Sequence, residues 1–339
     1  MALLLTFIAG FRSIDTGFDY QQYVSFITFI ESSNNIFDLM TNNLRFEPIF
    51  LLSSYTITKI LSFEFVFVFL FYSIMGVFFK AIAFNKLSPL PVISLLLYFQ
   101  AQYFYGDFAQ IRQSVAMTFF LFSVYYLWKK RHFPSIIFLL LASFSHYSAV
   151  FCFIIYPLSF IFTKTRKKTL LSSLFILLLL SIVFSFIQLK TSSFLSQIVP
   201  FELLSSKIVS YSKSEYSDAI DFGISDIIRI TTCILIYFII IKKDKKDIFI
   251  FSYLYIVGCI IFFLLKNDGI LASRITSYFK ILDCIILPQI IYEILLNKKI
   301  KKFMLNFVII TTLLSIYSIT SFYKNVIITP EIYNYEMSY

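Results

Sequence analysis

The chain has 339 residues, of which 59% are hydrophobic and only 14% are charged, and its mean hydropathy is +0.82. A soluble domain carries roughly 25% charged residues, so this composition excludes an ordinary water-soluble protein and indicates a chain built for the bilayer. The net charge of +10 does not indicate nucleic-acid binding, because most lysines stand in short clusters between apolar runs, as in cytoplasmic loops.

The continuous apolar runs predict an all-α fold, a polytopic integral membrane protein with about ten transmembrane helices. Residues 1–11 are apolar but too few to cross a bilayer. Residues 12–45 are mixed, and within them 18–31 (FDYQQYVSFITFIE) have one apolar face, which predicts a helix lying at the membrane interface. Spans are then expected at 46–62, 65–84, 89–105 and 108–128.

The apolar stretch 133–162 is flanked by two basic clusters, WKKRH (128–132) and TKTRKK (163–168). Both flanks should therefore be cytoplasmic. Since two full spans need roughly 40 residues, we predict a broken or re-entrant hairpin instead. Its turn is expected at SFSHYS (143–148), the polar part of the stretch.

Beyond the hairpin, spans are expected at 169–190, 225–241, 248–265, 273–296 and 303–322. If each expected span crosses the membrane once, counting spans back from the cytoplasmic cluster WKKRH places Lys80 and Lys86 on the cytoplasmic side, and places residues 12–45 there too. A re-entrant piece within 46–62 or 89–105 would instead place the 12–45 loop on the outer side. We predict a single transmembrane domain over 1–339, with outside loops near 12–45 and 191–224.

The arginines are distributed differently from the lysines. Arg112, Arg229 and Arg274 are each expected within about one turn of the outer end of a span. Ionisable residues there are functional candidates, although snorkelling to lipid headgroups is the alternative. Because the guanidinium fork binds phosphate in a bidentate way, the three predict a site for a membrane-anchored phosphate or pyrophosphate.

His146, at the expected turn, is a candidate general base, although a lone histidine in an apolar stretch is commonly structural. Among nearby acids, Asp107 could simply pair with Arg112, and the i, i+3 spacing of Asp226 and Arg229 predicts an ion pair. Four cysteines within apolar runs and two histidines indicate no disulfide framework and no metal site, and no cofactor is expected. The remaining acids considered are Asp268 and, if 12–45 lies outside, Asp19 and Glu47.

Four segments together resemble the EpsG family, the Wzy-like bacterial polysaccharide polymerases. They are FRSIDTGFDYQQY (11–23), FEP (46–48), the pair 108–131 with 142–158, and ASRITSYFKILDCIILP (272–288). The third is the most specific, because an Ile-Arg-Gln-x-x-Ala helix is followed by a Phe-x-His-x-Ser-Ala turn. The resemblance covers nearly the whole chain.

The resemblance implies a GT-C-like fold and a metal-independent glycosyltransferase in the bacterial inner membrane. Such an enzyme joins repeat units carried on undecaprenyl pyrophosphate at the outer face. The implied partners are undecaprenyl-pyrophosphate-linked oligosaccharides, the bilayer and a chain-length regulator. By position, five residues match family motif residues: Arg12, Asp19, Arg112, His146 and Arg274. Arg12 thereby joins Arg112, Arg229 and Arg274 as candidate pyrophosphate ligands, and His146 or Asp19 is the candidate base. Further candidates are Arg45, Glu47 and Asp107.

Other functions remain open at this point. An O-antigen ligase uses the same donor with a lipid A core as acceptor, and only the motif match separates it from a polymerase. A flippase would move the same lipid without chemistry, but the internal pseudo-symmetry typical of transporters is not seen. A membrane-bound acyltransferase would need more polar groups within its spans.

Overall fold

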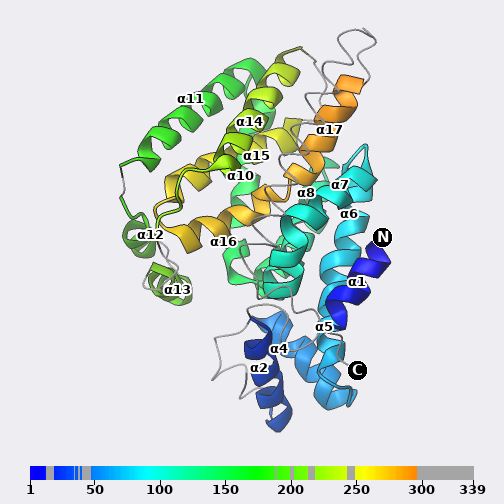
Figure 1. Cartoon of the computed structure of the whole chain (residues 1–339). Helices are drawn as coiled ribbons and strands as arrows, with labels where there is room; N and C mark the ends of the chain where they lie inside the picture. Colours follow the sequence, from blue (N-terminus) through cyan, green and yellow to red (C-terminus); the bar gives the residue numbers. More distant parts are fainter. Residues whose placement is uncertain are drawn as a thin grey trace. The chain divides into compact units, whose positions relative to one another are not determined.

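The computed structural model describes residues 1–12, 19–33, 35–36, 39, 47–187, 189–198, 202–212, 218–242 and 249–295. All regular elements in these ranges are helices (Figure 1), which confirms the predicted all-α class. Arg45, the basic cluster 297–302 and the expected last span 303–322 lie outside the described residues. The described chain forms two compact units, unit 1 over Met1–Val150 together with Ile294 and Leu295, and unit 2 over Phe151–Glu293.

Unit 1 has helices at each of the four ranges where spans were expected before the hairpin, in addition to α1, α2 and α9. The helix Val66–Leu87 has 22 residues and a mean hydropathy of 2.1. Within the described part of the chain it alone is both long enough and apolar enough to cross a bilayer. The elements of unit 1 are α1 (Ala2–Gly10), α2 (Tyr20–Ser32), α4 (Pro48–Tyr55), η1 (Thr56–Ile60), α5 (Val66–Ser73), η2 (Ile74–Phe78), α6 (Phe79–Leu87), α7 (Pro91–Tyr98), η3 (Phe99–Ala109), α8 (Ile111–Trp128), α9 (His132–Ser145) and the start of η4 (Tyr147–Ile154).

The centre of unit 1 is α8, which packs against α9 and α6. Its long apolar and small polar side chains are buried on nearly every side, the pattern of a helix enclosed by other helices. Arg112, in its first turn, is its one charged residue. The first turn of α8 therefore holds the ionisable side chain of this helix.

The predicted amphipathic helix within 18–31 is observed as α2. Tyr20, Tyr23, Phe26, Ile27 and Ile30 recur at helical spacing and are buried. The rings of Tyr23 and Phe26 lie 5.4 and 5.7 Å from that of Phe50 in α4. The apolar face that suggested a membrane interface is thus packed against protein.

The predicted break in 133–162 is confirmed at His146. Helix α9 ends at Ser145, His146 is extended (φ −158°, ψ 121°), and the chain continues in the tighter 3₁₀ turns of η4. Ser143 and Ser145 direct their hydroxyls to backbone carbonyls four residues back, a competing bond that favours helix ends and bends. The expectation that both flanks lie on one side of a membrane stays a prediction.

Unit 2 is organised around α15, which contacts α10, α11, α14 and α16. Part of the expected outside loop 191–224 is itself helical, as α12 and α13. The elements of unit 2 are α10 (Ile155–Lys164), α11 (Lys167–Ser185), α12 (Ser192–Ile198), α13 (Glu202–Ser212), α14 (Ile224–Lys242), α15 (Phe249–Leu265), α16 (Gly269–Lys280) and α17 (Asp283–Leu295).

The helix over the expected span 273–296 is interrupted, because the chain turns at Ile281 and Leu282 between α16 and α17. That this segment crosses a membrane stays a prediction. The Leu282 N–H donates to Phe279 O and the Cys284 N–H to Ile281 O, both at 3.1 Å, so the helix tightens to i→i−3 bonds. Pro288 lies inside α17, where it has no N–H to offer the carbonyl of Cys284.

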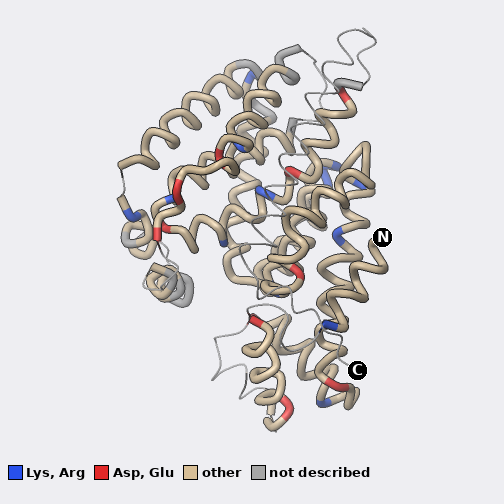
Figure 2. Tube along the Cα trace, in the orientation of Figure 1, with Lys and Arg blue, Asp and Glu red and all other residues tan. Residues whose placement is uncertain are grey.

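Helix α11 presents an apolar face outward. Leu171, Leu174 and Leu178 are buried, whereas Leu179 and Val183 are 61% and 63% exposed. A soluble protein rarely leaves a contiguous apolar surface in water, but the same surface is stable against lipid tails. Long helical stretches of both units also carry no charged residue (Figure 2).

Candidate active site

Arg112 stands in the first turn of α8, where the positive end of the helix dipole disfavours a cation. The carboxylate of Glu47 compensates, since Arg112 Nη1 forms an ion pair with Glu47 Oε2. Arg112 Nε also donates to the Tyr23 hydroxyl at 3.4 Å, and the guanidinium lies 5.3 Å from the centroid of that ring. The Glu47 side chain is 2% exposed but that of Arg112 is 20% exposed, so Arg112 is the more accessible member of the pair.

Glu47 joins three parts of unit 1. It precedes α4, with Pro48 in the first turn, a position that suits proline because no helical N–H is lost. Its Oε2 holds Arg112 of α8, and its Oε1 accepts from the backbone N–H of Tyr147 at 3.4 Å. A single carboxylate therefore ties the start of α8 to the break after α9.

His146 adjoins this contact through the Tyr147 peptide. Its side chain is buried, and its Nδ1 lies 2.7 Å from the Ser148 hydroxyl. When Nδ1 carries the proton and donates to Ser148, Nε2 has the lone pair that can accept a proton. We call Tyr23, Glu47, Arg112, His146 and Tyr147 the Arg112 cluster.

The Arg112 cluster brings together three of the four segments that carry the sequence motifs; the fourth, 272–288, lies in unit 2. Tyr23 comes from 11–23, Glu47 from 46–48, Arg112 from 108–131, and His146 from 142–158. Sequence reasoning missed Tyr23, although its place four residues after Asp19 on the apolar face of α2 was a usable signal. Asp19 itself occupies the N-cap position of α2, one turn before Tyr23, and its backbone carbonyl accepts from the Tyr23 N–H.

Asp107 does not pair with Arg112, so that part of the sequence reading is corrected. Its carboxylate instead accepts from Lys80 Nζ at 3.2 Å, from Ser114 Oγ at 2.6 Å and from the Tyr98 hydroxyl. We call Lys80, Tyr98, Asp107 and Ser114 the Lys80 cluster. Lys80 is 1% exposed, so it is not the loop charge that the topology count assumed.

The Lys80 cluster depends on close backbone approach at Gly76. A Cβ there would collide with Asp107 Oδ1, and Thr118 Oγ1 donates to the Gly76 carbonyl at 3.0 Å. Gly76 lies in η2 and Asp107 in η3, two π-helical segments in which the wider turn reorients side chains. The absence of a side chain at Gly76 and the wider turns of η2 and η3 thus make room for the buried ion pair between Lys80 and Asp107.

Arg12 is enclosed by protein rather than presented to a ligand. It is 1% exposed, and its guanidinium lies 4.8 to 5.5 Å from the ring centroids of Tyr20, Phe69 and Phe108. Its Nη1 donates to Ala9 O, while its Nε and Nη2 are buried without a partner. Burial lowers the pKa of Arg12 to about 10, so the side chain stays protonated at neutral pH.

In unit 2 the predicted ion pair between Asp226 and Arg229 is confirmed, with Arg229 Nη1 3.0 Å from Asp226 Oδ1. Asp226 also accepts from Lys266 Nζ at 2.6 Å. Asp268 accepts from the backbone N–H and the hydroxyl of Thr191, which anchors the start of α12. Arg274 is half-buried in α16.

No group of three or more histidine, cysteine, aspartate or glutamate side chains lies close enough to hold a metal ion in the described ranges. The polar groups that are assembled are an arginine, a carboxylate, a histidine and tyrosine hydroxyls. This set suits binding of an anionic group and proton transfer.

Comparison with known proteins gives two matches. The model of the EpsG family matches residues 1–337. The chain is also 25% identical over 326 residues to the amylovoran biosynthesis protein AmsC of Erwinia amylovora. The aligned region covers 94% of this chain and 82% of that protein. No solved structure matches. Since the family model matches almost the entire chain, the resemblance found in its motifs is confirmed, and the protein belongs to the EpsG family.

Proposed function

We propose that this protein polymerises lipid-linked oligosaccharide repeat units at the outer face of the bacterial inner membrane. The growing glycan would pass from undecaprenyl pyrophosphate to a hydroxyl of the next lipid-linked unit. Membership of the EpsG family and similarity to an amylovoran biosynthesis protein support a polymerase of polysaccharide biosynthesis. The observation that carries the proposal is the Arg112 cluster, which holds a partly exposed arginine beside a histidine.

The reaction exchanges one bond at the anomeric carbon for another. The bond to the pyrophosphate oxygen breaks, and its electron pair leaves with undecaprenyl pyrophosphate. The acceptor oxygen forms the new glycosidic bond and loses its proton to a base. Since pyrophosphate is already a good leaving group, the protein needs chiefly to place the reactants, stabilise the departing charge and take one proton.

The cluster offers a group for each task. The exposed edge of Arg112 would bind the departing pyrophosphate oxygens. Nε2 of His146 would take the proton from the acceptor hydroxyl. Glu47 would be a positioning residue, because it holds both Arg112 and the Tyr147 peptide beside His146. Asp19, near Tyr23 at the start of α2, is the alternative base.

The proposal places the protein as a multi-pass protein in the inner membrane. The helix Val66–Leu87 and the outward apolar face of α11 support lipid contact. Cysteine labelling at Lys130 and Lys167 tests the proposed hairpin. Labelling of both from the cytoplasmic side is expected, and labelling from opposite sides would exclude a hairpin between them.

The function is tested by the lipid-linked glycans of a strain that lacks the protein. If the protein is a polymerase, this strain should contain only single lipid-linked repeat units in place of the series of chain lengths, and the wild-type gene should restore the longer chains. An intact lipid-linked ladder that is no longer attached to lipid A would indicate a ligase instead. Loss of outward transport, with single units accumulating inside, would indicate a flippase.

A further inference from the structure

The segment that links α11 to α14 is fastened to unit 2 at both of its ends. We call residues 191–223, which include α12 and α13, the α12–α13 segment. Helix α12 packs against α13 and α13 packs against α16, and the start of α16 lies close to α12 (Figure 1). Both ends of the segment meet the turn 266–268, which joins α15 to α16. One short turn therefore holds the whole segment.

Asp268 holds the beginning of the segment. Its Oδ2 accepts from the Thr191 N–H at 2.5 Å, from the Thr191 hydroxyl at 2.8 Å and from the Ser192 N–H at 3.0 Å. Asp268 occupies the N-cap position of α16, where an aspartate ordinarily accepts from its own helix, but it makes no such bond. Its side chain is buried. The carboxylate at the start of α16 thus caps α12 instead.

Lys266 holds the end of the segment. Its backbone carbonyl accepts from the Ile220 N–H at 3.0 Å. Its ammonium lies 4.5 Å from the centroid of the Phe222 ring and donates to Asp226 at 2.6 Å. Asp226 in turn accepts from the Gly223 N–H at 3.0 Å. The end of the segment is thereby fixed to the same turn as its beginning.

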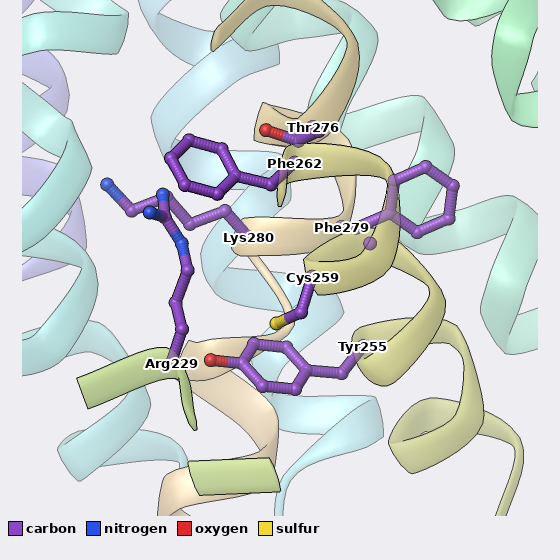
Figure 3. A pocket seen from close by; sticks show the side chains of 8 residues that line it. Arg229, Tyr255, Cys259, Phe262, Thr276, Phe279 and Lys280 are labelled. Carbon is purple, nitrogen blue, oxygen red and sulfur yellow. The ribbon is translucent and has the colours of Figure 1, made fainter. Parts of the chain in front are cut away.

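Helix α16 is a firm support for the segment, because it packs closely on α15. A Cβ at Gly258 of α15 would collide with Phe279 of α16. The pocket between α14, α15 and α16 (Figure 3) has a volume of about 10 Å³, which leaves room for at most one water molecule. Helix α16 also carries Arg274, which belongs to the motif segment 272–288. The turn therefore fixes the α12–α13 segment relative to a motif-bearing helix.

We propose that Asp268 is a positioning residue for the proposed reaction, because it holds the α12–α13 segment against α16. Connecting segments that a rigid scaffold positions commonly carry binding function. The fastened segment forms part of the surface on which the incoming lipid-linked unit binds. The inference rests on the proposed function. Asp268 acts through α12 and touches no reactant, a role different from that of the acids considered as bases.

The test measures the mobility of α12 by electron paramagnetic resonance of the full chain in nanodiscs. A spin label at Phe194→Cys reports on α12, because Phe194 is 65% exposed and the four native cysteines are buried. Asp268→Ala should raise the ratio of released to fastened α12 at least about 10-fold, the effect of losing one charge-assisted hydrogen bond. A label at the exposed Ile176→Cys in α11 should not respond.

Asp268→Asn separates the charge of the side chain from its shape. Asp268 Oδ1 has no hydrogen-bond partner, so an amide nitrogen can replace it while the amide oxygen still accepts from Thr191 and Ser192. The mobile fraction should therefore lie between those of the wild type and Asp268→Ala. The control is Asp221→Ala, an exposed acid of the same segment, which should match the wild type.

Three results would overturn the fastening role. They are wild-type mobility in Asp268→Ala, an equal change in Asp221→Ala, and wild-type mobility in Asp268→Asn if Asp268→Ala fails to fold.

Kinetics with lipid-linked units distinguish positioning from stability. Asp268→Ala should raise the apparent KM about 10-fold and leave kcat near that of the wild type, because only the fastened fraction binds the incoming unit well. Asp268→Asn should recover part of this loss. An equal loss of rate at every substrate concentration, matched by a loss of folded protein, would reduce Asp268 to a structural residue.

The mobility measurement needs no turnover, so it fails separately from the proposed function. Unchanged mobility in Asp268→Ala, together with loss of polymer in His146→Ala, would refute the positioning role and leave the polymerase standing. Increased mobility in Asp268→Ala, in a protein whose deletion leaves the glycan ladder intact, would support the fastening of α12 and refute the polymerase.

Discussion

The Lys80 and Arg112 clusters of unit 1 are two ion pairs with different surroundings. Lys80 and Asp107 are 1% and 2% exposed, and Tyr98 and Ser114 complete their hydrogen bonds. Glu47 is equally buried, but its partner Arg112 is 20% exposed. A charged pair enclosed on all sides can only hold the fold together, whereas a cation with an accessible edge can meet a ligand. Exposure of the cation separates the two roles better than residue type does.

The largest effect is expected from breaking the enclosed pair. Lys80→Met leaves the Asp107 carboxylate buried without its cation, which typically costs about 3–5 kcal/mol of folding stability. The folded protein should fail to accumulate in membranes. Lys86→Met, an exposed lysine of the same helix, is the control and should accumulate normally. Wild-type abundance and melting temperature in Lys80→Met would show that the pair is dispensable.

His146→Ala tests the chemistry proposed for the Arg112 cluster. A general base contributes about 10²–10⁴-fold to rate, so polymer formation should fall by that factor while the protein still inserts normally. His146→Gln keeps a hydrogen bond to Ser148 but cannot take a proton at neutral pH. A wild-type rate in His146→Gln would reduce His146 to a structural residue of the turn, and Asp19 would then be the next base to test. The matched control is the exposed His132→Gln.

Arg112→Lys should lower polymer formation about 10- to 100-fold without loss of protein, because lysine keeps the charge but not the planar fork. Arg131→Lys, an exposed arginine of a basic cluster, should have no effect. Polymer yield and chain-length distribution are the measurements. Full activity in lysine replacements of Arg112, Arg229 and Arg274 would show that a positive charge at the level of the lipid headgroups is sufficient for polymer formation.

The smallest effect is expected for Glu47→Gln, about three- to tenfold on polymer formation. The amide oxygen still accepts from the Tyr147 N–H, and the partly exposed Arg112 is screened by solvent when the carboxylate charge is removed. Glu64→Gln, an exposed glutamate of the same unit, should match the wild type. A loss as deep as that of His146→Ala would instead make Glu47 a participant in the chemistry.

Local sequence determined the elements of this protein. Apolar runs of sufficient length gave helices at the expected places, because backbone groups in an apolar surrounding are best satisfied within a helix. The serines around His146 marked the break after α9, and the i, i+3 spacing of Asp226 and Arg229 specified their ion pair. In each case the interacting groups lie within a few residues of one another.

Tertiary packing decided which distant groups meet. Arg112 pairs with Glu47 rather than with nearby Asp107, and Asp107 pairs with Lys80, because tertiary packing brings the start of α4 to α8 and brings η3 to α6. Spacing along the chain carries no information about such partners. Which ionisable residues are enclosed and which keep an accessible edge is therefore set only when the helices assemble.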